Sequence, residues 1–396
     1  MGKVLFTLLK AFKSFRLFWF RIFGKSEADL YAKRIVNGKS WEDFCERLKT
    51  AGAALTYPDA PRDPFSQAEG VRYLSRLTRA ALEAHVEYND VEFPELRRMV
   101  HETVKLGADN PDNYYLNAKI SGVYEYRITG KRNTIDYIGF FTQNGDYGST
   151  GGLAPCGVLE DKDLQIDEDG KLEIILSKNR KGKNWLKIED DTTLLMVRQT
   201  FFDRKKELPA ELKIENLNGQ KAPHPTSPEK IDKGLETAAL FIAGAPMLFA
   251  KWAKGFKKHP NTLPVFDPKV SNAAGGDSNI IYHHSYWKLE DNEALIIEFI
   301  PPECDTWNFQ LNNYWMESLD YRYFPISVNK SSAKTDTNGK VKIIVSKTDP
   351  GISNWIDTCS HNEGTMCLRW YRLKKNAKPV VPDCSVVKIS DIAKDE

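Results

Sequence analysis

The segment richest in reactive side chains lies near the C-terminus, where Asp357, Cys359, His361 and Glu363 alternate with small polar residues. In an extended strand alternate side chains share one face, so these four would form a nucleophile or metal site. A neutral imidazole suits general-base catalysis, and Asp357 is near enough in sequence to fix the tautomer of His361. The interleaved serine, asparagine and glycine favour a turn instead, in which His361 caps a hairpin and Asp357 bonds a backbone N–H group.

A pair of carboxylates upstream is a second candidate for acid–base chemistry. Glu317 and Asp320 are followed by Arg322. If one carboxyl were buried and its pKa raised, the pair could act as general acid and general base. The commoner outcome of this spacing is a surface ion pair. His361, Asp357, Glu317 and Asp320 are therefore the candidate catalytic residues.

The strand that precedes these carboxylates offers a candidate ligand-binding face. Asn308, Gln310 and Asn312 alternate with apolar residues, so their three carboxamides would point the same way. Such a row could hydrogen-bond a polyol or an amide, with Tyr314 and Trp315 nearby for stacking and Arg322 as a charged contact. The alternative is a solvated outer face of an antiparallel sheet. No metal site is expected, because the adjacent His283 and His284 would face opposite sides of a strand.

An internal repeat indicates how these residues are positioned. Residues 169–178 match residues 338–347, each beginning with a turn dipeptide that ends in glycine and continuing as an alternating strand. A polar loop follows, and then an Asn-Trp corner that provides an aromatic anchor. The remaining paired segments are Asn184-Trp185-Leu186 with Asn354-Trp355-Ile356, and Val197-Arg198-Gln199 with Leu368-Arg369-Trp370. Short strands separated by turns predict a mainly β protein of two tandem jelly-roll-like β-sandwich modules, related by internal duplication, with helical additions and N-terminal helices.

The C-terminal copy resembles the bacterial domain of unknown function 1214. The resemblance rests on Pro301-Pro302, Trp307-Asn308-Phe309, Asp349-Pro350-Gly351, Asn354-Trp355 and Leu368-Arg369-Trp370-Tyr371. It covers residues 285–378 well and the first copy more loosely. The resemblance implies a jelly-roll-like β-sandwich and brings no settled activity. The second uncharacterised domain that often precedes this one in the family, numbered 1254, is not recognised here.

The N-terminal residues 1–26 have the pattern of a basic amphipathic helix. Six lysines and arginines occur in this segment without any acid. One face of the helix is apolar and would contact a membrane through Leu8, Phe12, Phe15, Trp19 and Ile22. A wide apolar arc opposed by basic residues is typical of a helix that lies on an anionic membrane surface. A helix docked on the protein itself or on a second copy, and an organelle presequence, are the alternatives.

The remaining segments divide the chain into domains. Residues 27–108 have helical periodicity and form a helical lead, in which Ser40 with Asp43 and Ser66 with Glu69 resemble capping pairs. Pro94 would open a further helix. Residues 109–220 and 279–390 are the two sandwich modules. Residues 228–256 form a helical connector whose apolar run is too short for a membrane span and favours a buried or interface helix.

Composition limits the function classes. The net charge is +2, so the chain without its basic N-terminal residues is close to −4 and offers no general case for nucleic-acid binding. The sequence names no cofactor. We expect an enzyme, located in the cytoplasm and peripheral at the membrane surface, that uses acid–base or hydrolytic chemistry on a small or amphipathic substrate in a cleft of the modules. The alternatives are a non-catalytic glycan- or lipid-binding module, and an assembly scaffold that forms a homo-oligomer.

Overall fold

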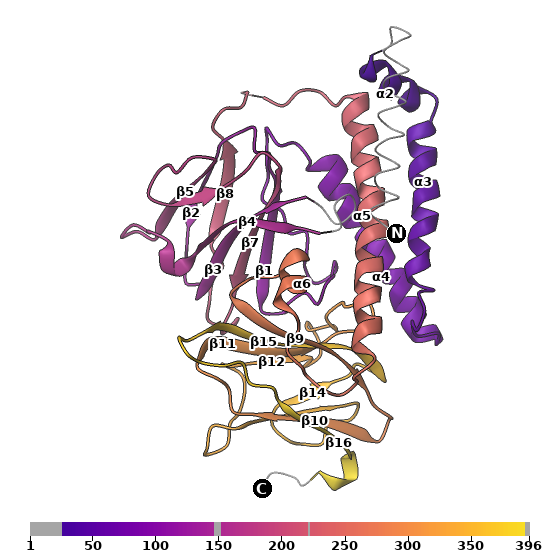
Figure 1. The fold of residues 1–396 in the computed structure, drawn as a ribbon, viewed down its shortest axis with the longest axis vertical. Coiled ribbons are helices and arrows are strands. Elements are labelled where there is room, and N and C mark those ends of the chain that lie inside the picture. Colours follow the sequence, from indigo (N-terminus) through magenta and orange to yellow (C-terminus); the bar gives the residue numbers. More distant parts are fainter. Residues whose placement is uncertain (1–25, 146–151, 221, 393–396) are drawn as a thin grey trace.

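The computed structural model describes residues 26–145, 152–220 and 222–392. Two β-sandwich modules lie next to each other, and a layer of helices runs along one side of both (Figure 1). The membrane-contact residues expected in the N-terminal segment, Leu8, Phe12, Phe15, Trp19 and Ile22, lie outside the described residues.

The first module consists of two four-stranded sheets, with the strand orders β1-β7-β3-β4 and β6-β5-β2-β8. Its strands are β1 (Asn113–Lys119), β2 (Tyr126–Lys131), β3 (Tyr137–Asn144), β4 (Ala154–Glu160), β5 (Lys171–Ser177), β6 (Trp185–Lys187), β7 (Thr192–Thr200) and β8 (Glu211–Asn216). A short 3-10 turn, η3 (Asp161–Asp163), follows β4. The apolar side chains of both sheets meet in one core, in which Ile128, Ile138 and Ile174 are fully buried.

The second module repeats this topology. Its sheets have the orders β12-β11-β15-β9 and β14-β13-β10-β16, so each strand corresponds to the one eight places earlier. Its elements are β9 (Ile280–Lys288), β10 (Glu293–Phe299), β11 (Cys304–Leu311), β12 (Ser327–Asn329), β13 (Val341–Ser346), β14 (Trp355–Asp357), β15 (Glu363–Leu373), β16 (Asp383–Lys388) and η4 (Ile389–Asp391). The prediction of two duplicated β-sandwich modules is confirmed.

The Asn-Trp corners show the duplication at the level of single contacts. In both modules the tryptophan begins a short strand that runs parallel to its neighbour, β6 to β5 and β14 to β13. The indole Nε1 of Trp185 donates to the backbone and hydroxyl oxygens of Ser177, and that of Trp355 donates to the same two atoms of Ser346. The corner therefore fastens the parallel strand to the sheet in each copy.

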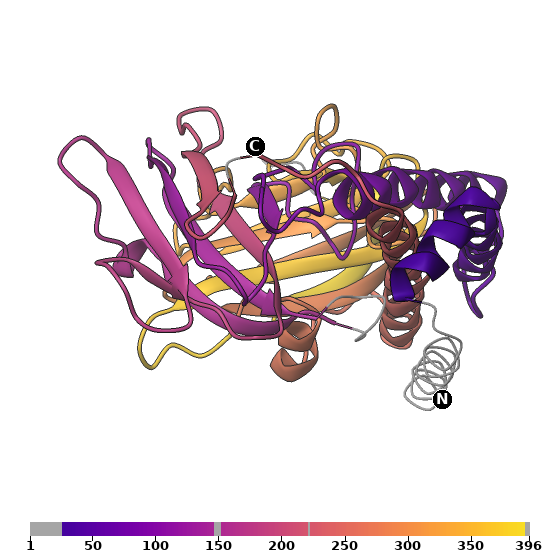
Figure 2. The same ribbon diagram turned by 90° about the horizontal axis from the view of Figure 1, so that it is seen from above.

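The helical layer surrounds one long helix. α5 (Pro228–Phe256) lies among α2 (Glu27–Val36), α3 (Lys39–Ala51) and α4 (Pro64–Leu82), and the two views agree on this arrangement (Figure 1, Figure 2). The minor elements are η1 (Gly52–Ala54), the π-helical turn η2 (Glu83–Glu87) and α6 (Pro268–Ala273). By length and composition α5 could cross a membrane, but 56% of that stretch is buried inside the protein, as in the core helix of a globular domain.

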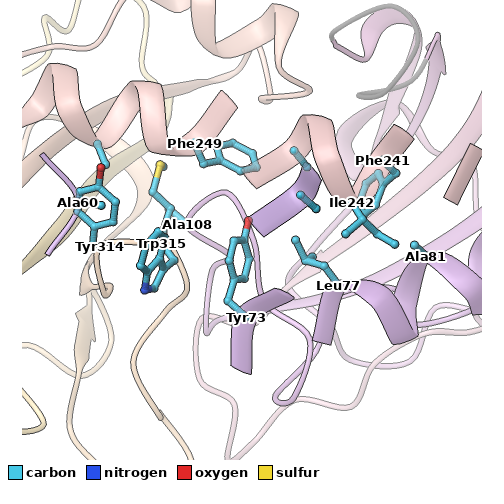
Figure 3. Close-up of a cluster of buried hydrophobic side chains, with 14 of the residues drawn as sticks. Ala60, Tyr73, Leu77, Ala81, Ala108, Phe241, Ile242, Phe249, Tyr314 and Trp315 are labelled. Atoms are coloured by element: carbon cyan, nitrogen blue, oxygen red, sulfur yellow. The ribbon is translucent and has the colours of Figure 1, made fainter. Parts of the chain in front are cut away.

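The core of the helical layer also packs against the second module. Leu77 of α4 and Ile242 of α5 are almost completely buried, in one cluster with Trp315 from the loop after β11 (Figure 3). No side chain fits at Gly70, because a Cβ there would lie 2.6 Å from the Trp315 ring. The helical lead is thus packed directly on the second β-module.

Three local expectations for the helical lead are wrong. Gly38 precedes α3, and the Ser40 hydroxyl donates to Asp232 of α5 rather than capping its own helix. Asp63 caps α4 by accepting from the backbone N–H of Ser66. The chain after Pro94 forms loops and isolated β-bridges, because it crosses the first module instead of packing as a helix. Tertiary contacts outweigh the local capping signals at these sites.

Candidate functional site

His361 is a buried residue in the turn between β14 and β15, with 6% of its surface exposed. Its Nδ1 lies 2.9 Å from the carbonyl oxygen of Thr358, and its Nε2 lies 2.5 Å from Oε2 of Glu69 on α4. Burial raises the pKa of Glu69, but the hydrogen bond and the charge of His361 outweigh it and hold that pKa below its usual range. Both ring nitrogens of His361 are therefore occupied by protein groups.

Asp357 does not position His361. Its Oδ1 accepts a hydrogen bond from the backbone N–H of Cys359 at 2.7 Å, so the expected role in fixing the tautomer of His361 is wrong. Cys359 and Ser360 both have positive φ, which bends the chain into a turn. The turn interpretation is confirmed, and the four groups that would share one face of a strand are separated by it. Sequence reasoning missed Glu69 as the partner because it lies on a helix 292 residues away.

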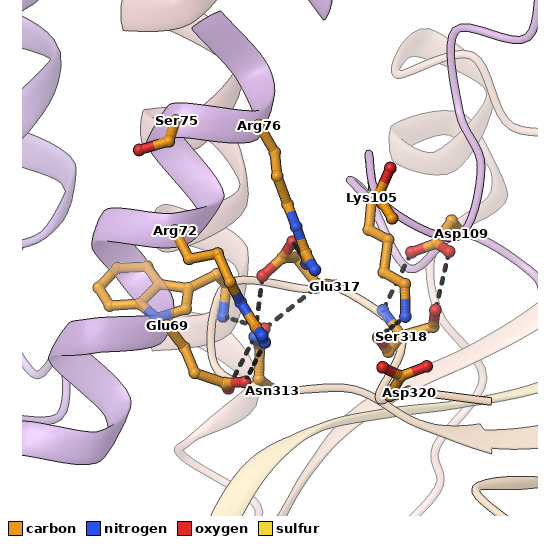
Figure 4. A network of polar contacts seen from close by, with 12 residues as sticks. Glu69, Arg72, Ser75, Arg76, Lys105, Asp109, Asn313, Glu317, Ser318 and Asp320 are labelled. Atoms are coloured by element: carbon orange, nitrogen blue, oxygen red, sulfur yellow. Dashed lines mark hydrogen bonds and ion pairs between the residues drawn. The ribbon is translucent and has the colours of Figure 1, made fainter. Parts of the chain in front are cut away.

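The two carboxylates Glu317 and Asp320 have different environments. Glu317 is buried, and burial raises its pKa, while Arg76 and Asn313 bond its two oxygens (Figure 4). Asp320 pairs with Arg322 through two contacts of 2.7 and 2.8 Å, and this bonding lowers the pKa of Asp320. The expected surface ion pair is thus formed by Asp320 and Arg322. Each carboxylate is paired with its own arginine, and neither lines the cavity between the two modules.

The carboxamide row is neither a ligand surface nor a solvated face. Asn308, Gln310 and Asn312 are all at most 1% exposed. The side-chain oxygens of Asn308 and Gln310 accept from the guanidinium of Arg369 at 3.4 and 2.6 Å. Their amide groups donate to the segment before β1, and Asn312 donates to Thr365. The row therefore holds Arg369 in place.

Tyr314 and Trp315 are also buried, so they offer no stacking platform. Both are 2% exposed and lie in the core of the helical layer, where the Trp315 indole donates to the backbone oxygen of Ser66. Their side chains belong to the packing between the helical lead and the second module. The predicted ligand-binding residues are consequently not brought together at any surface.

A cavity of about 200 Å³ lies where the two modules meet α5. The sheet strands β1, β7, β9 and β15 contribute polar side chains to its wall, whereas Phe241, Phe249 and Trp252 of α5 contribute aromatic rings. Concave sites that combine an apolar wall with a few convergent polar groups are the usual form of a small-molecule site. Arg198 and Arg369 both line this cavity.

The two arginines occupy equivalent positions in the duplicated sheets. Arg198 on β7 lies opposite Tyr115 on β1, and Arg369 on β15 lies opposite Tyr282 on β9. Burial raises the pKa of Tyr282 to about 12, and both arginines oppose that increase. Burial likewise raises the pKa of Tyr115, again against both arginines. Both arginines thus act on both tyrosines, so the two Arg–Tyr pairs form one polar patch.

Each arginine reaches across to the other module. Arg198 donates to the carbonyl oxygen of Gly275, in the segment that leads into β9. Arg369 donates to the carbonyl oxygen of Ala108, in the corresponding segment before β1. The two segments are built alike, because the backbone N–H of Asn110 donates to the Tyr115 hydroxyl just as that of Asp277 donates to the Tyr282 hydroxyl. The contacts between the modules are therefore pseudo-symmetric.

The symmetry does not extend to the immediate partners of the two arginines: on the adjacent strand Asn308 lies opposite Arg369 and Gly139 lies opposite Arg198, and the nearest charges also differ. Asp277 provides a carboxylate 3.4 Å from the Arg198 guanidinium, whereas the equivalent residue near Arg369 is the neutral Asn110. Among the described residues, no carboxylate lies within ion-pair distance of Arg369, which is 3% exposed. Asp109 and Asp112 sense its charge only at longer range. Arg369 is thus a buried cation whose direct partners are neutral oxygens.

Three tyrosine hydroxyls next to this cation retain a proton to donate. The hydroxyls of Tyr115, Tyr282 and Tyr371 each accept a hydrogen bond, from Asn110 or Asp277. Within the described ranges, none of the three donates to another protein group. A phenol both donates and accepts. The patch thus combines guanidinium and phenol donors, which is the chemistry of an anion site.

Sequence reasoning did not single out Arg198 or Arg369 as functional, although both were part of the repeat. The signal that was present is an arginine at the equivalent position of a largely buried strand in both copies. A lysine or arginine in a buried strand requires a partner. That partner could not be identified without the other module.

Comparisons with known proteins extend the resemblance. A family model described as "Protein of unknown function (DUF1214)" matches residues 155–201 and 295–375, which include both arginines. An uncharacterized protein from Burkholderia cenocepacia, known from its crystal structure, is 48% identical; the match covers 91% of this chain and 100% of that chain, with a TM-score of 0.89. The VPA0106 protein from Vibrio parahaemolyticus is 12% identical, with 86% of this chain and 100% of that chain covered and a TM-score of 0.44. No curated protein matches the chain.

Proposed function

Because this chain belongs to the DUF1214 family, whose description carries no function, we propose a function from its cavity: the protein binds a small organic acid between its two modules. The observation that carries the proposal is the position of Arg369. It is a buried guanidinium at the cavity wall, and the carboxylate that pairs with its duplicate, Arg198, is replaced by Asn110.

The charge of Arg369 favours an anionic ligand. Transferring an ion from water into the protein interior costs several kcal/mol unless a counter-charge compensates. The neutral oxygens of Gln310, Asn308 and Ala108 orient the guanidinium without cancelling its charge. A ligand carboxylate beside Arg369 would pair with it as Asp277 pairs with Arg198. The phenol groups of Tyr282 and Tyr371 would donate to the same anion.

The rest of the wall favours an apolar body on the ligand. Phe241, Phe249 and Trp252 face the cavity from α5, and Leu194 and Met196 face it from β7. The cavity exceeds the roughly 150 Å³ of an engineered cavity that binds benzene and is smaller than the roughly 300 Å³ at which drug-sized pockets begin. A compact aliphatic or aromatic acid matches this volume and polarity.

Ligand binding in the cavity has more support than catalysis by His361 or Glu317. His361 and Glu317 are engaged by protein partners and lie outside the cavity wall, so a ligand in the cavity would not contact them. Attachment to an anionic membrane surface through residues 1–26, on the cytoplasmic side, is a separate proposal. It rests on the basic amphipathic pattern alone.

The test compares hexanoate with its neutral analogue hexanamide, using thermal shift and calorimetry. Wild type should be stabilised by hexanoate and not by hexanamide; a ligand at 100 times its Kd stabilises by about 2.7 kcal/mol. Asn110→Asp restores the second carboxylate and should abolish the response, as should Arg369→Met. Arg127→Met, at an exposed ion pair on β2, is the matched control and should respond as wild type does.

Two results would contradict the proposal. Hexanoate and hexanamide could stabilise the wild-type protein equally, which would show that the charge of Arg369 plays no part. Alternatively, Asn110→Asp could bind hexanoate as tightly as wild type. Inorganic phosphate is included to separate recognition of an organic acid from recognition of any anion.

A further inference from the structure

Two buried histidines line the same cavity and are not used by the anion patch. His85 is 5% exposed and His284 is 6% exposed, and both belong to the cavity wall. His85 Nε2 and His284 Nδ1 have no hydrogen-bond partner in the part of the chain that the structure describes. Buried polar atoms are nearly always paired, so each unpaired nitrogen requires an explanation.

The backbone brings His85 to the cavity by an unusual route. Helix α4 ends in the π-helical turn η2, and His85 lies in that turn, with its ring near Phe241 of α5. π-Helical turns are rare and frequently occur at functional sites. His85 lines the cavity from this turn together with Glu83 and Ala84.

His284 lies on the same strand face as the anion patch. Its ring stacks on Tyr282, two residues earlier on β9, with the ring centroids 5.4 Å apart and an interplanar angle of 5°. Trp252, Phe256 and Phe266 also pack against the ring, which nevertheless lines the cavity. Two residues along a strand span about 7 Å. The backbone of His284 is therefore about 7 Å along β9 from that of Tyr282, which lies opposite Arg369.

Both histidines are neutral in this environment. Burial, with a smaller effect of Arg369, lowers the pKa of His284 to about 3. Burial, with a smaller effect of Lys119, lowers the pKa of His85 to about 3. A neutral imidazole has one donor and one acceptor nitrogen, so it pairs with a hydroxyl or carbonyl group rather than with a second anion.

We infer that the acid bound in the cavity carries a second polar group, a hydroxyl or carbonyl oxygen, at the end away from its carboxylate, and that this group hydrogen-bonds His284. The inference rests on the proposed function, because the carboxylate must first be held by Arg369. His85 lines the same cavity elsewhere, beside Phe241 of α5, and takes no part in this contact. The ligand class is thereby narrowed from organic acids to acids with a distal hydroxyl or keto group.

A set of matched acids tests this inference by calorimetry on the full chain. The probes are hexanoate, 6-hydroxyhexanoate with its hydroxyl at the far end, and 2-hydroxyhexanoate with its hydroxyl beside the carboxylate. Wild type should bind the 6-hydroxy acid at least about tenfold more tightly than hexanoate, since a site built to bond a hydroxyl disfavours the analogue without it. His284→Phe should bind hexanoate and the 6-hydroxy acid with equal affinity; His224→Phe, in an exposed loop, is the control and should keep the preference.

A measurement on the wild-type protein avoids dependence on a variant that fails to fold. The imidazole ¹⁵N signals of His284 should shift when the 6-hydroxy acid binds and shift less when hexanoate binds. Equal affinities for hexanoate and the 6-hydroxy acid would overturn the inference and leave the proposed function standing. Equal gains from the two hydroxy acids would also overturn it, because the polar group would then not be distal. If none of the acids binds, the proposed function itself fails.

Discussion

Glu69 and His361 are 292 residues apart in the chain, yet Oε2 of the carboxylate lies 2.5 Å from Nε2 of the imidazole. The pair joins α4 of the helical lead to the turn between β14 and β15 of the second module. Glu69 also accepts from Arg72 and Asn313, so its charge is shared by a small network. The contact therefore gives α4 a second role besides apolar packing, since it supplies the partner of His361.

Replacing His361 should therefore cost more stability than a surface turn residue would. We expect His361→Ala to lower the free energy of unfolding by about 3 kcal/mol, since it leaves the nearly buried carboxylate of Glu69 without its imidazole. Urea denaturation measures the difference. His224→Ala in an exposed loop is the control, and a loss below 1 kcal/mol for His361→Ala would show that the contact with Glu69 adds little stability.

The two cavity histidines predict how stability depends on pH. Their pKa values are lowered to about 3 in the folded protein, compared with about 6.5 in the unfolded chain. The unfolded chain thus binds more protons below pH 6.5, so this stability is complete above that pH and declines toward pH 3. Each histidine contributes a slope of about 1.4 kcal/mol per pH unit.

The variant that checks this dependence is His284→Gln, which keeps a neutral hydrogen-bonding group but cannot titrate. Its free energy of unfolding should vary less steeply between pH 6 and pH 4 than that of wild type, by the contribution of one histidine. Denaturant titrations at several pH values provide the measurement. An unchanged slope would mean that His284 protonates as readily in the folded protein as in the unfolded chain.

The duplicated Asn-Trp corners should contribute equally to stability. Trp185→Phe and Trp355→Phe each remove an indole N–H that donates to two serine oxygens, Ser177 in one module and Ser346 in the other. We expect a loss of about 1 kcal/mol in each case, the usual net value of one hydrogen bond. Trp41→Phe, on the exposed face of α3, should change little. If only one of the two variants loses stability, the indole hydrogen bonds of the other corner do not contribute to stability.

The basic N-terminal pattern predicts membrane attachment that can be removed without unfolding the protein. Deleting residues 1–25 should release the chain from anionic vesicles in a co-sedimentation assay, because each basic residue contributes about 1 kcal/mol near a charged surface. The melting temperature should be retained. A variant with Phe12, Phe15 and Trp19 changed to serine keeps the charge and isolates the apolar contribution. Equal pelleting of truncated and full-length proteins would exclude the anchor.

The sequence by itself determined the architecture of this protein. Alternation of apolar residues, glycine turns and the two Asn-Trp corners identified both modules, and the apolar run near Ala245 placed the helix that became α5. These features are local, because strand and helix periodicity record which side chains are buried within one element. The strand order that the two modules share was not predicted and comes from the structure.

Only the tertiary structure decided where the functional groups meet. Arg198 and Arg369 become one site because two modules pack face to face, and the contrast between Asp277 and Asn110 acquires meaning only once each is seen beside the other module's arginine. The partner of His361 was also missed for this reason, because its Nε2 bonds Glu69, which lies on a helix distant in the sequence. Periodicity encodes the burial of a side chain, but its partner is set by the packing of elements that the chain brings together from far apart.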